Sequence, residues 1–115
     1  MIKMSLFLTR RSDLTFEQFS EYWANVHWPI VQTVPEVLEH TIRYVQQHNV
    51  GGLPEGVPAA PFDGYAEAWF ANKEAIYKVI GSPKWDEIVA VDDENFLDRS
   101  KTLVLFTEEK VDYVA

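Results

Sequence analysis

The chain begins with side chains that alternate between apolar and polar, which is the two-residue period of a β-strand. One face of this strand carries Ile2, Met4, Leu6 and Leu8, and the other carries Lys3, Ser5, Phe7 and Thr9. Alternation returns from His40 to Val50 and from Tyr65 to Phe70, and an apolar stretch from Thr102 to Thr107 suits one more strand. The pattern therefore predicts four strands.

A helical period separates the first two strands, because apolar residues recur every three or four positions at Phe16, Phe19, Trp23, Val26 and Ile30. Thr15 and Gln18 have the spacing of a capping box, which starts a helix. Pro29 has no amide proton and disfavours helical geometry at the residue before it. We therefore expect the helix to end or kink at His27-Trp28, with a short helical turn around Ile30 to Val34.

Three further segments complete the order of elements. Lys73 to Ile80 reads as a helix ended by Gly81, and Ser82-Pro83 then starts another. Gly51 to Pro61 holds three of the five glycines and three of the six prolines, so it predicts a loop. The order βαββαβ predicts a single α+β domain over residues 1–115 with a ferredoxin-like fold, a four-stranded antiparallel sheet with helices on one face.

The other face of such a sheet has no helices to cover it. Its residues are expected to include Phe7, Val45, Tyr65, Trp69 and Val104. Because an apolar patch of this size is rarely left in water, the pattern predicts a homodimer.

Composition narrows the partners and the chemistry. The net charge of -8 argues against nucleic acid, which binds to clustered basic residues. The absence of cysteine excludes disulfides, thiolate nucleophiles and thiolate metal sites. No apolar run approaches the roughly 18 residues of a membrane-spanning helix. We therefore expect a cytoplasmic protein that contacts neither membranes nor nucleic acid.

Two motifs resemble the EthD family: Phe19-x-x-Tyr22-Trp23-x-x-x-His27-x-Pro29 on the first helix, and Asp93-Glu94-x-Phe96-x-Asp98 before the last strand. The resemblance implies a dimeric α/β barrel, in which two sheets pack face to face, and a small-molecule substrate. Members of the EthD family are associated with ether degradation, muconolactone isomerisation, and dehydration or decarboxylation of aromatic polyketides. The resemblance places the motif histidine at His27, and a looser resemblance to muconolactone isomerases places a polar pocket residue near His40.

His27 is the candidate catalytic residue, because an imidazole with a pKa near 6.5 can transfer protons at neutral pH. A structural role, in which His27 bonds the last carbonyls of the helix, is the alternative. The candidate substrate-binding residues are Trp23, Trp28, His40, Arg43, Tyr65 and Trp69. For Tyr65 and Trp69 the alternative is packing in the dimer interface, and for Arg43 it is a solvated or paired charge.

The acidic residues Asp92, Asp93, Glu94 and Asp98 lack the glycine and the ligand spacing of a calcium loop, so we expect a solvated turn or cap. His40 and His48 would lie roughly 26 Å apart on one strand, too far for one metal. The sequence predicts no metal site and no bound cofactor.

The hypothesis that follows is a cofactor-independent lyase or isomerase that acts on a small cyclic or aromatic, enolisable substrate with His27 as general acid or base. Two alternatives remain open. The same fold can serve a cofactorless oxygenase, or a non-catalytic carrier of hydrophobic metabolites or haem with His27 as an axial ligand.

Overall fold

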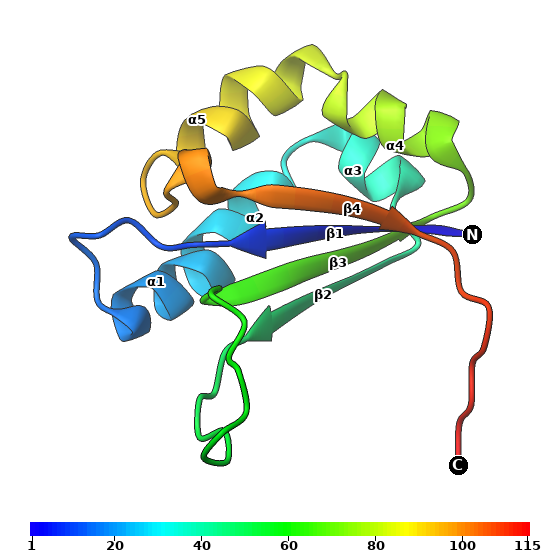
Figure 1. Cartoon of the computed structure of the whole chain (residues 1–115). Helices are drawn as coiled ribbons and strands as arrows, with labels where there is room; N and C mark the ends of the chain where they lie inside the picture. The colour runs from blue at the N-terminus through cyan, green and yellow to red at the C-terminus, as the bar shows by residue number, and fades with distance from the viewer.

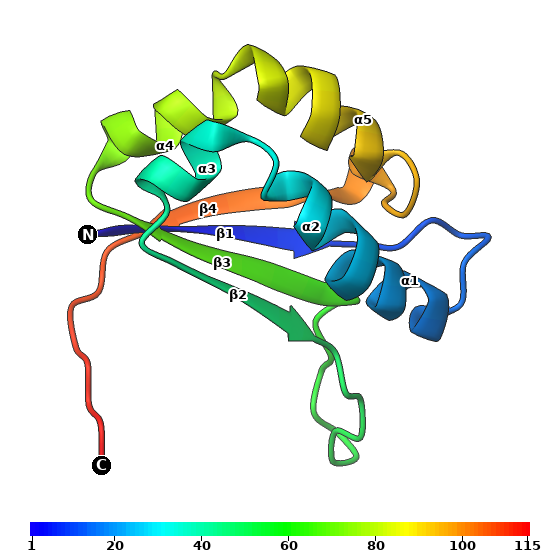
Figure 2. The same cartoon turned by 180° about the vertical axis from the view of Figure 1, so that it is seen from behind.

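A four-stranded antiparallel sheet forms one layer of the molecule, and helices cover only one of its faces (Figures 1 and 2). A computed structural model describes all residues, 1–115. The strands are β1 (Ile2–Leu8), β2 (Arg43–His48), β3 (Gly64–Phe70) and β4 (Leu103–Thr107), in the order β2-β3-β1-β4. Every neighbouring pair is antiparallel, so the predicted α+β sheet architecture is confirmed.

The first helical segment runs without a break from α1 (Phe16–Tyr22) through a π-helical turn (Trp23–His27) into α2 (Trp28–Val31). The predicted end at His27-Trp28 is therefore wrong. The amide of Trp28 donates to the carbonyl of Trp23, five residues back, and Pro29 follows directly. Pro29 thus sits near the start of α2, where a proline, which has no amide proton to donate, is tolerated.

The π-helical turn changes which residues face the sheet. Hydrogen bonds to the fifth preceding residue widen the turn, so residues four apart stay in line. Phe19, Trp23, His27 and Val31 are all buried as a result. Val26 belongs to the apolar stripe predicted from the spacing of three or four residues, but its side chain is 41% exposed. His27 therefore lies within the buried stripe, at 6% exposure.

A short helix, α3 (Pro35–His40), precedes the second strand. The predicted strand from His40 is wrong at its start, because His40 ends this helix and β2 begins only at Arg43. Pro35 occupies the first turn of α3, where its missing amide proton costs nothing.

The second half of the helical layer begins with α4 (Lys73–Ile80), whose predicted bounds are confirmed. The chain turns at Gly81, and a second helical segment starts at Pro83, passes through a π-helical turn (Trp85–Val89) and ends as α5 (Ala90–Asp93). A 3-10 turn (Arg99–Lys101) then leads into β4. None of the helices has both the length and the apolar character needed to cross a bilayer.

Small residues on β3 let the helices approach the sheet closely. Ala66 and Ala68 face the helical layer and are buried in its apolar core. A Cβ atom at Gly64 would lie 2.5 Å from the carbonyl oxygen of Gln47 and 2.9 Å from the ring of Trp23. The indole of Trp23 can therefore occupy its position only because residue 64 has no side chain.

The opposite face of the sheet is open (Figure 1). Strand register places Leu103 opposite Phe7 and Leu105 opposite Ser5, so both leucines belong to this face, and each is more than half exposed. The prediction of Val104 on the open face is wrong, since Val104 pairs with Leu6, whose side chain packs against the buried core beneath the helices. Residues 108–115 extend from the edge of the sheet as an irregular tail.

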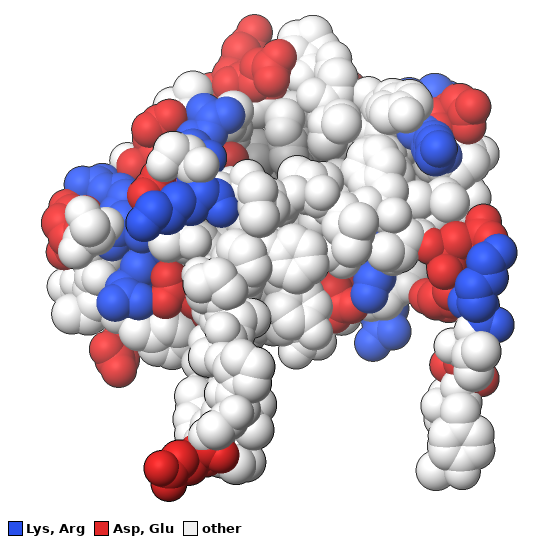
Figure 3. Space-filling model, in the orientation of Figure 1, with Lys and Arg blue, Asp and Glu red and all other residues white.

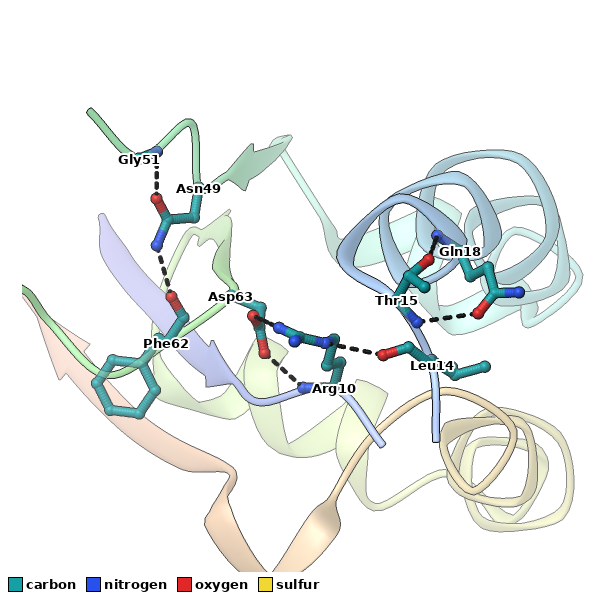
Figure 4. Close-up of polar contacts among 8 residues, drawn as sticks. All are labelled: Arg10, Leu14, Thr15, Gln18, Asn49, Gly51, Phe62 and Asp63. Atoms are coloured by element: carbon teal, nitrogen blue, oxygen red, sulfur yellow. Dashed lines mark hydrogen bonds and ion pairs between the residues drawn. The ribbon is translucent and has the colours of Figure 1, made fainter. Parts of the chain in front are cut away.

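The predicted loop is present, and the irregular segment covers residues 49–63. Hydrogen bonds and an ion pair fix the two ends of this segment (Figure 4). Arg10 and Asp63 form an ion pair, and the Arg10 amide also donates to the same carboxylate at 2.8 Å. The Asn49 side chain donates to the carbonyl of Phe62 at 2.9 Å and accepts from the amide of Gly51 at 2.7 Å. These contacts close the base of the loop and leave its tip exposed.

Candidate active site

A cavity of about 250 Å³ lies between the sheet and the helical layer. Its walls are mostly apolar and include the aromatic rings of Trp23, Tyr44, Trp85 and Phe96. Its polar lining residues are His27, Asp93 and Thr102. An apolar cavity with a few convergent polar groups is the usual form of a small-molecule site.

His27 and Asp92 form the central contact beside this cavity. The Nδ1 atom of His27 lies 2.7 Å from Oδ2 of Asp92, and both side chains are buried. His27 comes from the end of the first π-helical turn and Asp92 from α5, 65 residues later. Packing of the two helical segments side by side creates the pair.

Other donors hold Asp92 in place. The Tyr22 hydroxyl and the Asn95 side-chain amide both donate to Oδ1, the amide at 3.0 Å. Burial alone would raise the pKa of Asp92, but the hydrogen bonds from Tyr22, His27 and Asn95 outweigh it and hold the pKa below its usual value. Asp92 is therefore an ionised carboxylate at neutral pH.

The ionised state of Asp92 assigns the tautomer of His27. A carboxylate can only accept hydrogen bonds, so Nδ1 of His27 must carry the proton in their contact. In the neutral imidazole this leaves a free lone pair on Nε2. The orienting partner on one nitrogen thus makes the other nitrogen available as a base.

Burial lowers the pKa of His27 from its ordinary value of 6.5, and this effect exceeds the opposing hydrogen bond and charge of Asp92. The ring of Phe96 packs on the imidazole with a centroid distance of 4.6 Å. His27 is therefore mainly neutral at pH 7, the state in which Nε2 can accept a proton.

A second carboxyl group faces the free nitrogen. Oδ1 of Asp93 lies 3.5 Å from Nε2 of His27, and Asp93 also lines the cavity. Burial raises the pKa of Asp93 to about 7; Arg99 counteracts this, and the charges of Asp92 and Glu94 add to it. The polar end of the cavity thus holds His27, whose pKa is lowered by burial, and Asp93, whose pKa is raised to about 7.

The structure brings together some of the predicted site residues. Trp23 and His27 line the cavity, and Trp28 stacks on Tyr44 with a centroid distance of 4.1 Å beside a smaller adjoining pocket. His40 lies away from the cavity at the end of α3, where its nearest charged neighbour is Glu39.

Three predicted substrate-binding residues lie on the other side of the sheet. Tyr65 and Trp69 point to the open face, where the Arg43 guanidinium lies 4.6 Å from the Trp69 ring centroid. The indole of Trp69 also donates to Glu109 at 2.6 Å. The sheet separates Arg43, Tyr65 and Trp69 from His27 within one protomer.

Asp92 and Asp93 are the residues that sequence reasoning missed. The expectation of a solvated acidic turn is wrong for both, since Asp92 is buried and Asp93 lines the cavity. One signal was present in the sequence. Carboxylates in the last turn of a helix are unfavourable beside its negative end, so an acidic pair there suggests a specific partner.

Fold and site together define a ferredoxin-like α+β domain with a histidine–carboxylate pair beneath its sheet. The chain belongs to the EthD family: the EthD domain model matches residues 11–100. The resemblance of the two sequence motifs to this family is thereby confirmed. No curated protein sequence matches the chain significantly.

Solved structures show the same fold at low sequence identity. An EthD-like protein from Ralstonia eutropha superposes with a TM-score of 0.72 at 18% identity, over 97% of this chain and 94% of its own. An EthD family protein from Bacillus halodurans gives 0.70 at 16% identity, over 95% and 98%. A dimeric protein of ferredoxin-like fold from Bacteroides fragilis gives 0.66 at 11% identity, over 94% and 95%.

Proposed function

We propose that this protein is a cofactor-independent lyase or isomerase that acts on a small cyclic or aromatic, enolisable substrate. The observation that carries the proposal is the 2.7 Å contact between His27 Nδ1 and Asp92, which leaves Nε2 free at the cavity. His27 is then the general acid or base, and Asp92 is the positioning residue.

The chemistry follows from the tautomer. Nε2 of His27 removes a proton from the carbon next to a carbonyl group, and the carbonyl becomes an enolate. The imidazolium that forms is stabilised by the ionised Asp92 on its other side. His27 then returns the proton to another atom, which completes an isomerisation, or protonates a leaving group, which completes a dehydration.

The cavity supports a small substrate. At about 250 Å³ it is smaller than a drug-sized site, and a cavity of roughly 150 Å³ already accepts benzene. Burial raises the pKa of Tyr44 to about 12, so its hydroxyl stays protonated and can donate to an oxyanion. A molecule of one or two rings fits these walls.

The test uses 2-tetralone, a neutral bicyclic ketone with exchangeable α-protons. The protein should accelerate its α-proton exchange in D2O, followed by proton NMR. Because a positioned acid or base typically contributes 10²- to 10⁴-fold, His27→Gln should lower the acceleration by about that factor.

His40→Gln is the matched control, because this histidine lies outside the cavity and should leave the rate unchanged. Retention of more than about a tenth of the acceleration by His27→Gln would exclude His27 as the proton-transfer group. Consumption of the ketone that depends on dissolved oxygen would favour the oxygenase alternative.

A homodimer belongs to the same proposal. The open sheet face, with Phe7, Leu103 and Leu105 among its side chains, is covered by no helix of the chain. The similar structure from Bacteroides fragilis is dimeric. Two copies packed face to face would bury these leucines and leave each cavity on the outer, helical side.

A further inference from the structure

The cavity holds no cation that could bind an anionic ligand. Among its lining side chains the only charged or titratable groups are His27, Asp93 and the Tyr44 phenol, and none is lysine or arginine. Sites for carboxylates or phosphates normally supply an arginine, a lysine or a set of aligned backbone amides. Here the polar end of the cavity instead presents a carboxyl group.

Most of the residues at the rim of the cavity between β4 and the helices are also uncharged. Val104 and Phe106 of β4 and Ile80 and Trp85 of the helical layer line it between the strand and the helices. Figure 3 shows mostly uncharged surface over β4 and in the recess between this strand and the helices above it, with charged groups around this area, including acidic groups at the top of the helical layer. The nearby Arg99 is directed to Glu94, with a 3.3 Å ion pair.

We propose that the cavity selects neutral ligands that bear a hydroxyl or ketone group and rejects carboxylates, and that Asp93 is the specificity-determining residue. The inference rests on the proposed function and names the substrate class for the same site. An anion entering the cavity would lose its hydration, meet no cation, and lie beside the Asp93 carboxyl. Muconolactones, which carry a carboxylate, would be poor substrates.

The charge of Asp93 makes this selectivity depend on pH. The titratable groups that face Asp93 are His27 and Tyr44 across the cavity, Asp92 and Glu94 beside it in the chain, and Arg99 before β4. Because its pKa lies at about 7, Asp93 is ionised at pH 8 and protonated at pH 5.5. Rejection of anions should therefore be strongest at pH 8.

The experiment compares 2-naphthol with 2-naphthoate, two ligands with the same rings and different charge. A naphthol stays neutral at pH 8, and a carboxylate stays ionised at pH 5.5, as the ordinary values of about 10 and about 4 indicate. Binding is measured from quenching of tryptophan fluorescence, since Trp23 and Trp85 line the cavity. At pH 8 we expect naphthol to bind at least tenfold more tightly than naphthoate.

Asp93→Asn should reduce this ratio to less than threefold, and the wild-type ratio should also fall at pH 5.5. Glu94→Gln, which removes the neighbouring exposed carboxylate, is the control and should keep the wild-type ratio. Equal binding of both ligands at pH 8, or an unchanged ratio in Asp93→Asn, would overturn the inference while leaving the proposed function standing. Failure of naphthol to bind the wild-type protein would contradict both the inference and the proposed function.

Discussion

Two neighbouring aspartates at the end of α5 experience opposite environments. Asp92 accepts hydrogen bonds from Tyr22, His27 and Asn95, and its pKa is lowered. Asp93 is only half-buried, no side-chain hydrogen bond stabilises its charge, and its pKa is raised. One carboxyl is therefore a fixed negative charge, whereas the other changes its charge near neutral pH.

The first prediction concerns stability at residue 93. The pKa of Asp93 rises from 3.8 to about 7 on folding, so below pH 4 both states hold the proton and its stabilisation is fully present. Between pH 4 and 7 the unfolded state loses the proton first, and the stabilisation is lost as pH rises. Asp93→Asn should therefore raise the melting temperature relative to wild type progressively from pH 4 to pH 7, with a plateau above.

Thermal unfolding of both proteins across this range checks the sign. A gain that shrinks as pH rises would show that Asp93 is ionised in the folded state throughout. Asp92→Asn provides a contrast. Because the pKa of Asp92 is lowered on folding, its ionised carboxylate stabilises the folded state above the unfolded pKa of about 3.8, and this stabilisation is lost in acid.

For single residues, the sequence was sufficient to identify His27 as a candidate but not to identify the residues that contact it. A histidine beside aromatic residues can be identified from spacing along one helix. Its contact with Asp92 spans 65 residues and depends on how two helical segments pack, which no local pattern encodes. Asp93 was visible only as part of a family motif, without a role.

The helices and strands differ in how far the sequence predicts them. The faces of β1, β2 and β3 follow directly from two-residue alternation, and the end of α4 follows from Gly81. The π-helical turn at Trp23–His27 could not be found, because a four-residue repeat of buried positions breaks the usual helical period. The helix α3 was missed, although Pro35 at its start was a usable signal.

The start of α1 supplies the second prediction. The Thr15 hydroxyl accepts from the Gln18 amide at 3.1 Å, and the Gln18 side chain accepts from the Thr15 amide at 2.9 Å (Figure 4). Thr15→Ala should lower the free energy of unfolding by about 1 kcal/mol in urea titrations, because one amide loses its acceptor. Thr15→Ser keeps the oxygen, so a loss of the same size in that variant would rule out the cap as the cause.

The third prediction concerns the close approach of β2 and the first π-helical turn to Gly64 of β3. A methyl group at residue 64 would meet the Gln47 carbonyl at 2.5 Å, a backbone atom that cannot rotate away. Gly64→Ala should lower the free energy of unfolding by about 1–3 kcal/mol, as overpacked sites do. It should also shift the fluorescence of Trp23, and an unchanged spectrum with unchanged stability would mean that the strands separate without cost.

The whole molecule has one covered and one uncovered face, and this asymmetry supplies the fourth prediction. Light scattering at micromolar concentration should give twice 13.3 kDa. Leu105→Asp places a charge on the open face and should yield the single chain, because a buried unpaired charge opposes association. Val91→Asp is matched to it, since Val91 is 61% exposed on the helical layer and should remain dimeric.

A wild-type particle of 13.3 kDa that persists at high protein concentration would exclude the dimer.

For the whole molecule, alternation in the sequence predicted the open face correctly, including Phe7 and Tyr65. It misassigned Val104 because the apolar run from Leu103 to Phe106 carries no polar residue to fix its phase.

The sheet separates the open face from the cavity, so each subunit of a dimer would contain its own complete site. His27, Asp92 and Asp93 all come from one chain and lie on the helical side. A mixed dimer of one intact and one His27→Gln subunit should therefore turn over at half the rate of the intact pair. Two differently inactivated subunits should not restore each other, so the protein would behave as two independent catalysts joined back to back.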